Sequence, residues 1–125
     1  MTIATICVSL LCLGVCAAQD RTASPVFACN LKTISTTERP RYNDLVKRLR
    51  SATRDRRELP DGYAFKLDSK AISLREVAEW ISMERLCCPF LTLQLSASGD
   101  QVDWLLNLTG PKGVKPLLQA EFPAR

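Results

Sequence analysis

A carboxylate and two adjacent thiols offer the clearest chemistry in this sequence. Glu84 precedes Cys87 and Cys88 by three and four residues, so the three side chains lie near one another if a helix persists to that point. Adjacent thiols can bind a thiophilic ion such as Hg(II), As(III), Cu(I) or Zn(II). A third sulfur, from Cys29, would complete a three-thiolate set if the fold brings it close. The candidate metal ligands are therefore Cys29, Cys87, Cys88 and Glu84.

The same cysteines allow a purely structural interpretation. Cys29 can pair with Cys87 or Cys88 in a disulfide, which leaves the third cysteine buried as a small apolar side chain. Such a bond closes a loop of about sixty residues and stabilises the fold by roughly 4 kcal/mol in the chain-entropy treatment. A bond between Cys87 and Cys88 is less favourable, because adjacent residues close a small strained ring. Soft-metal binding, a disulfide and inert core cysteines all remain open on the sequence.

The composition excludes most familiar hydrolases. The chain has 125 residues, of which 46% are hydrophobic and 24% charged, and a formal net charge of +4, as expected for one small globular domain. It has no histidine, so Ser-His and Cys-His pairs and histidine-ligated metals are ruled out. A thiolate at a helix C-terminus also faces the negative end of the helix dipole, which raises its pKa. A binding role is favoured over catalysis.

The first eighteen residues have the pattern of an export signal. They are almost entirely uncharged and apolar and end in small residues suited to signal-peptidase cleavage. The apolar run is shorter than the roughly 20 residues that span a bilayer, so membrane contact is expected only if the leader stays uncleaved. Lipidation at Cys16 is a weaker alternative. Cleavage predicts a periplasmic or secreted protein with a linker over residues 19–26 and one domain over residues 27–125.

Hydrophobic periodicity predicts an α+β fold. Ser73 and Glu76 fit a capping box that starts a central helix, and Pro89 ends that helix. Pro116 either delays or kinks the last helix. The element order α-β-α-β-β-α suits a two-layer sandwich with a small antiparallel or mixed three-stranded sheet. The predicted elements are a helix over about 37–53, a strand over 63–67, the central helix, strands over 90–96 and 102–108, and a last helix after 109–111.

A basic segment accompanies the first predicted helix. Residues 38–58 contain eight Lys or Arg and four Asp or Glu, so the segment can attract an anionic surface. A solvated helix face is the simpler interpretation, because Tyr42 is the one aromatic residue within the segment and fits the buried stripe. Nucleic-acid binding also conflicts with export. We therefore expect no nucleic-acid partner.

The spacing of the cysteines resembles that of a family of small bacterial proteins with one early cysteine and an E-x-x-C-C-x-F motif. The resemblance runs over nearly the whole chain after the leader, through Phe27–Leu31, Ala78–Trp80, Glu84–Phe90 and Leu108–Lys115. Members of that family often lie near genes of heavy-metal-responsive regulators, which implies thiol chemistry or metal handling. The leader and Pro116 depart from the family pattern. By this resemblance the motif falls on Cys29, Glu84, Cys87 and Cys88.

These observations predict a small exported thiol protein that binds a soft metal ion through Cys29, Cys87 and Cys88, with Glu84 as a further candidate ligand. The alternative function is a non-catalytic interaction module. In that case a disulfide from Cys29 to Cys87 or Cys88 stabilises the fold, and the basic helix is the contact surface.

Overall fold

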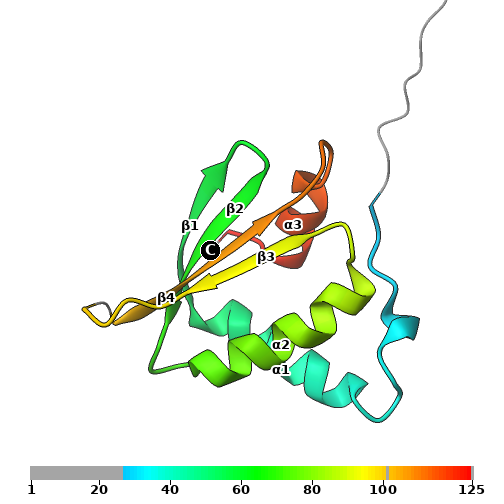
Figure 1. The fold of residues 1–125 in the computed structure, drawn as a ribbon, viewed down its shortest axis with the longest axis horizontal. Coiled ribbons are helices and arrows are strands. Elements are labelled where there is room, and N and C mark those ends of the chain that lie inside the picture. The colour runs from blue at the N-terminus through cyan, green and yellow to red at the C-terminus, as the bar shows by residue number, and fades with distance from the viewer. Residues whose placement is uncertain (1–26, 101, 125) are drawn as a thin grey trace, which may run out of the picture.

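The fold packs three α-helices against a four-stranded antiparallel sheet with the strand order β1-β2-β4-β3 (Figure 1). The computed structural model describes residues 27–100 and 102–124, so the leader and linker predicted over residues 1–18 and 19–26 lie outside the described residues. The predicted α+β class is confirmed. The three-stranded sheet and the order α-β-α-β-β-α are wrong, because the sheet contains one further strand.

Helix α1 (Arg39–Ala52) corresponds to the first predicted helix. Its buried face includes Tyr42, Leu45 and Leu49, which recur at helical spacing. Pro40 lies in the first turn, where a missing backbone N–H leaves no helical hydrogen bond unmade. The burial of this face directs the Tyr42 side chain into the interior.

Strand β1 (Thr53–Leu59) was not predicted, because the predicted elements place no strand between the helix over about 37–53 and the strand over 63–67. It pairs with β2 (Gly62–Asp68) across a tight turn and lies at the edge of the sheet. Five of its seven residues are charged. Charged side chains are common on edge strands, where they discourage pairing with other chains. Such a strand lacks the apolar alternation by which strands are predicted.

Helix α2 (Leu74–Cys87) begins at the predicted capping box. The Ser73 hydroxyl accepts a hydrogen bond from the Glu76 backbone N–H at 3.2 Å, and the Glu76 carboxylate accepts one from the Ser73 N–H at 3.0 Å. Pro89 follows shortly after the last helical residue, as predicted. The two signals fix both ends of the helix that carries most of the candidate ligands.

Strands β3 (Thr92–Ser96) and β4 (Asp103–Thr109) form the predicted hairpin, and β4 also pairs with β2. Helix α3 (Lys115–Glu121) follows β4. Pro116 lies in its first turn, so the proline delays the start of the helix rather than kinking it.

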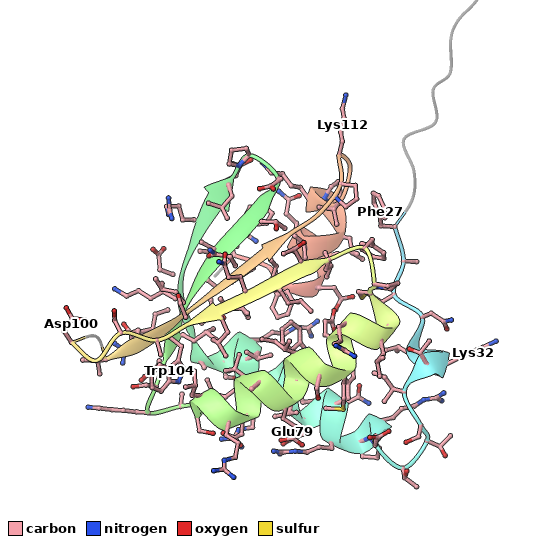
Figure 2. The ribbon with its side chains drawn as sticks, in the orientation of Figure 1. Phe27, Lys32, Glu79, Asp100, Trp104 and Lys112 are labelled. Atoms are coloured by element: carbon pink, nitrogen blue, oxygen red, sulfur yellow. A yellow bond between two sulfur atoms is a disulfide. The ribbon has the colours of Figure 1, made fainter. Side chains whose placement is uncertain are left out.

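The core lies between the sheet and the helices. Trp80 of α2 is fully buried and meets the Phe122 ring edge-on at 5.9 Å, and the Phe65 ring of β2 lies 5.2 Å from that of Phe122. Trp104 lies near the start of α2 (Figure 2), and its indole N–H donates to the Ile72 carbonyl oxygen at 2.9 Å. Across residues 27–100 and 102–124, no helix has the length and apolar character that a membrane span requires.

Candidate functional site

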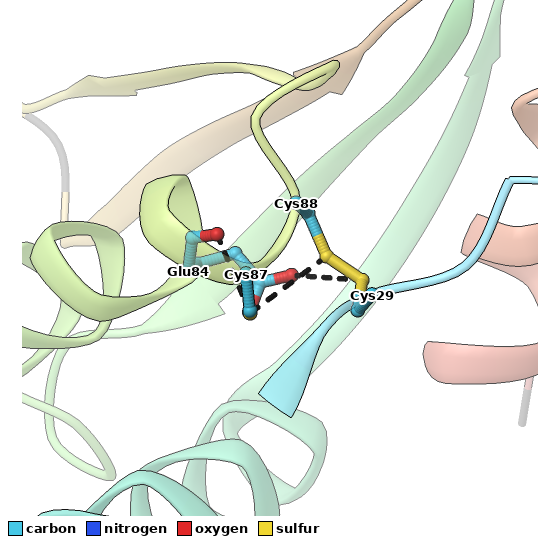
Figure 3. A group of neighbouring side chains, drawn as sticks. All are labelled: Cys29, Glu84, Cys87 and Cys88. Atoms are coloured by element: carbon cyan, nitrogen blue, oxygen red, sulfur yellow. Dashed lines mark hydrogen bonds between the residues drawn. A yellow bond between two sulfur atoms is a disulfide. The ribbon is translucent and has the colours of Figure 1, made fainter. Parts of the chain in front are cut away.

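The structure brings the four predicted ligand residues together. The ligand atoms of Cys29, Glu84, Cys87 and Cys88 all lie within 4.8 Å of one another (Figure 3). Cys29 comes from the segment before the short 3-10 helix η1 (Leu31–Thr33), and the other three come from the C-terminal end of α2. Glu84, Cys87 and Cys88 are buried, whereas Cys29 is partly exposed. The predicted proximity of the early sulfur to the pair is confirmed.

The end of α2 positions three of these groups. The Cys88 backbone N–H donates to the Glu84 carbonyl oxygen at 2.8 Å, so helical geometry continues to the C-cap. The Leu91 N–H then donates to the Cys88 carbonyl oxygen at 3.0 Å and turns the chain toward β3. This turn holds the two cysteine side chains against the core.

Two contacts that do not involve sulfur hold Cys29 beside the helix end. The Asn30 backbone N–H donates to the Cys87 carbonyl oxygen at 2.8 Å, which satisfies one of the carbonyls left unpaired at a helix C-terminus. On the other side of Cys29, the Phe27 and Phe90 rings lie 4.8 Å apart. Residues within two positions of Cys29 are thus attached to Cys87 and to Phe90, which lies two residues after Cys88.

Cys29 and Cys88 form a disulfide, with their Cα atoms 4.8 Å apart. The sequence left Cys87 and Cys88 as equal candidates for this bond, and the structure selects Cys88. Cys87 is the free cysteine among the described residues, and only 1% of its surface is exposed. A structural disulfide and a potential metal cluster therefore occupy the same place, although the sequence presented them as alternatives.

The Cys87 thiol is enclosed by polar groups. Its Sγ lies 3.8 Å from Cys88 Sγ, 3.7 Å from Glu84 Oε2 and 3.9 Å from the Tyr42 hydroxyl. Burial, with the neighbouring Glu84 carboxylate, raises the pKa of Cys87 to about 11. The sequence predicted a raised thiol pKa from the helix dipole, whereas in the structure burial is the largest of the causes that raise this pKa. The thiol is therefore protonated at neutral pH and is a poor nucleophile.

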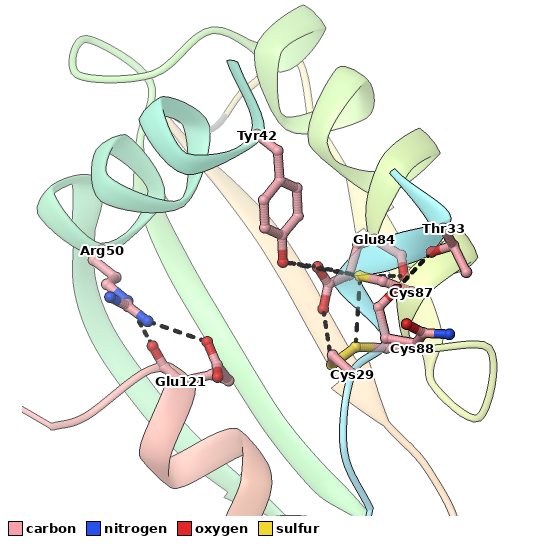
Figure 4. Close-up of a disulfide and its surroundings, with 9 residues drawn as sticks. Cys29, Thr33, Tyr42, Arg50, Glu84, Cys87, Cys88 and Glu121 are labelled. Atoms are coloured by element: carbon pink, nitrogen blue, oxygen red, sulfur yellow. Dashed lines mark hydrogen bonds and ion pairs between the residues drawn. A yellow bond between two sulfur atoms is a disulfide. The ribbon is translucent and has the colours of Figure 1, made fainter. Parts of the chain in front are cut away.

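Glu84 is a buried carboxyl group with a specific partner. Only 4% of its surface is exposed, and the Tyr42 hydroxyl donates to its Oε2 at 2.7 Å (Figure 4). Burial raises the pKa of Glu84, and the hydrogen bonds from Tyr42 and Cys87 oppose that rise. Burial and the Glu84 charge also raise the pKa of Tyr42.

Tyr42 belongs to the site, although the sequence predicted it only as part of the buried stripe of the first helix. That prediction is confirmed for the ring, but it gave the hydroxyl no partner. A buried tyrosine hydroxyl usually has a hydrogen-bond partner. A tyrosine on the buried stripe of a predicted helix therefore indicates that a polar group lies next to it in the core.

Much of the charge of the basic segment is engaged within the protein. The Arg41 guanidinium donates to both carboxylate oxygens of Glu79, at 2.9 and 2.7 Å, where α1 and α2 lie side by side (Figure 2). Arg48 pairs with Glu76, and Arg54 pairs with Asp68 at 2.7 Å. These ion pairs give the basic residues a structural role. They also reduce the positive charge that is available to an external anion.

Comparison with protein-family models, with curated proteins and with solved structures found no match to this chain. The resemblance to the bacterial family with the E-x-x-C-C-x-F motif stays a prediction. Support for a function therefore comes from the geometry of the cysteine cluster itself.

Proposed function

We propose that the protein in its reduced state binds one thiophilic metal ion through Cys29, Cys87 and Cys88, with Glu84 as the fourth ligand. The observation that carries this proposal is the gathering of four ligand atoms within 4.8 Å, three of them sulfur, from segments about sixty residues apart. Three sulfurs and one oxygen favour Hg(II), As(III), Cu(I) or Zn(II) over Mg(II) and Ca(II), which prefer oxygen ligands.

The spacing of the two buried sulfurs supports the proposal. Two thiolates bound 2.3 Å from one tetrahedral ion are about 3.8 Å apart. The Sγ atoms of Cys87 and Cys88 are separated by 3.8 Å. Reduction of the Cys29–Cys88 bond frees the third sulfur, whose side chain can then change rotamer within the cluster. The spacing of Cys87 and Cys88 therefore supports a shared ion, with Cys29 as the third ligand once it is reduced.

The disulfide is consistent with the proposed location outside the cytoplasm. Disulfides persist in the periplasm and in secreted proteins, whereas cytosolic thiols are usually kept reduced. We therefore propose export as the context of this site. Cell fractionation of the tagged full chain, with and without residues 1–18, checks this point.

Metal titration tests the proposed function. The full chain with Cys7→Ser, Cys12→Ser and Cys16→Ser, called the background chain below, retains only the three clustered cysteines. After reduction and removal of the reductant, native mass spectrometry should show one Zn(II) per chain, and alkylation of all three thiols should abolish it. A reduced, folded background chain that retains no Zn(II) contradicts the proposal.

A matched variant controls for thiol number. In the background chain, the double variant Cys87→Ser/Ser96→Cys keeps three thiols but moves one to the exposed far end of β3. The proposal predicts Zn(II) binding about 100-fold weaker than in the background chain, because loss of a ligand costs at least as much as the 10- to 100-fold loss caused by outer-shell changes. Equal binding by the two proteins would mean that any three thiols suffice.

A further inference from the structure

Two of the four proposed ligands are joined to each other. The Cys29–Cys88 disulfide removes two of the three sulfurs that the proposed metal site requires. The bond joins Cys29, a partly exposed residue, to Cys88, of whose surface 0% is exposed. This difference in residue exposure favours Cys29 as the side from which an external thiol approaches the bond.

We propose that the Cys29–Cys88 disulfide is a redox gate on the metal site, and that a dithiol reductant opens it by attacking Cys29 Sγ. This inference rests on the proposed function and adds its regulation and the chemical class of its partner. Metal binding and the disulfide are mutually exclusive states of the same residues. The oxidised chain leaves one thiol and one carboxyl group, which is too few ligands for a closed soft-metal site.

The exchange balances without any further reactant. A thiolate of the reductant attacks Cys29 Sγ, the bond between the two protein sulfurs breaks, and its electron pair leaves on Cys88 as a thiolate. The second thiol of the reductant then attacks the reductant's first sulfur, which is bonded to Cys29 in the mixed disulfide, and Cys29 leaves as a thiolate. The reductant becomes an internal disulfide, and the protein gains two electrons and two protons. Cys29 and Cys88 are then both available as ligands.

Cys87 does not open the gate from inside. Attack by Cys87 on Cys88 Sγ, 3.8 Å away, would join adjacent residues in a strained ring. The gate therefore responds to an external thiol.

The open state keeps its ligands together. The hydrogen bond from the Asn30 N–H to the Cys87 carbonyl oxygen and the contact between the Phe27 and Phe90 rings do not depend on the disulfide. They attach the chain on both sides of Cys29 to the end of α2. Reduction thus releases the sulfurs without releasing the segment that carries Cys29.

Zn(II) competition against a chromogenic chelator tests the gate, and Zn(II) suits this purpose because it is redox-inert. The oxidised background chain should bind Zn(II) about 100-fold more weakly than the same chain after reduction, because two thiolates are withheld. Equal binding by both forms overturns the gate and leaves the metal site in place. A reduced chain that binds no Zn(II) overturns the proposed function and the gate with it. The Cys29→Ser variant should bind Zn(II) equally before and after treatment with reductant.

The site of attack is tested separately by trapping. The oxidised background chain with Cys87→Ala is exposed briefly to glutathione, quenched in acid, and mapped by peptide mass spectrometry. The adduct should lie on Cys29, with a free thiol on Cys88. An adduct found mainly on Cys88, or reduction without any adduct on Cys29, overturns the assigned route of opening.

Discussion

Replacement of Tyr42 by phenylalanine removes one oxygen atom and tests whether the buried carboxyl group of the site depends on it. The Tyr42 hydroxyl donates to Glu84 Oε2 at 2.7 Å, and only 4% of the Glu84 surface is exposed. Hydrogen bonds to charged groups contribute about 1.5–3 kcal/mol, and neutral ones about 0.5–1.5 kcal/mol. We expect Tyr42→Phe to lower the free energy of unfolding by about 2 kcal/mol near pH 8.

The pH dependence of this loss follows from the direction of the Glu84 pKa shift. Burial raises the folded-state pKa of Glu84 above its unfolded value, so the folded protein holds the proton more tightly and stability falls as pH rises between the two values. The Tyr42 hydrogen bond opposes that rise. Its removal raises the folded pKa further and extends the loss of stability to higher pH. The cost of Tyr42→Phe should therefore be smaller near pH 5 than near pH 8.

Urea unfolding of the oxidised protein at both pH values measures this effect. Tyr63→Phe is the matched control, because the Tyr63 hydroxyl accepts a hydrogen bond from the uncharged Gln119 side chain at 2.6 Å. That variant should show a smaller loss with little pH dependence. In a chain that already carries Glu84→Gln, Tyr42→Phe should lower the free energy of unfolding by less than it does in the unmodified protein. A cost for Tyr42→Phe below about 0.5 kcal/mol at both pH values would refute the reasoning, since it lies under the range for a neutral hydrogen bond.

Three further predictions concern stability. Cys29→Ser removes the disulfide across 59 residues and should cost about 4 kcal/mol relative to the oxidised background chain, measured by urea unfolding; a loss under 1 kcal/mol contradicts a stabilising crosslink. Gly62→Ala should cost about 1–3 kcal/mol, because its Cβ would overlap the Leu108 carbonyl oxygen, and an unchanged urea midpoint argues against that close approach. The folded-state pKa of Cys87 is about 11, which exceeds the ordinary value of a thiol. The free energy of unfolding should therefore fall between pH 9 and 11 by up to about 1.4 kcal/mol per pH unit more than in Cys87→Ala. Parallel pH profiles of the two proteins would be inconsistent with a buried thiol.

Local signals were sufficient to predict several elements of the fold. The capping box at Ser73 and the proline at position 89 bound α2 closely, because each acts within one helical turn. Alternation of apolar residues likewise predicted the hairpin of β3 and β4. Strand β1 escaped prediction because its residues are mostly charged, and its pairing with β2 is a property of the sheet rather than of its own sequence.

The site was predictable in its members but not in its bonding. The spacing of Glu84, Cys87 and Cys88 on a helix follows from helical geometry, which is local. The position of Cys29 beside the end of α2 depends on contacts between segments about sixty residues apart. Its disulfide partner, Cys88 rather than Cys87, depends on the turn after α2. The role of Tyr42 required the packing of α1 against α2, which sequence periodicity does not specify.

In the proposed function, three cysteine sulfurs of one reduced chain share one metal ion. X-ray absorption spectroscopy of the reduced, Zn(II)-loaded background chain examines this sharing, because the scattering counts the sulfur neighbours of the metal. We expect three sulfurs at about 2.3 Å and one oxygen at about 2.0–2.2 Å from the zinc. A first shell with fewer than three sulfurs would contradict this prediction.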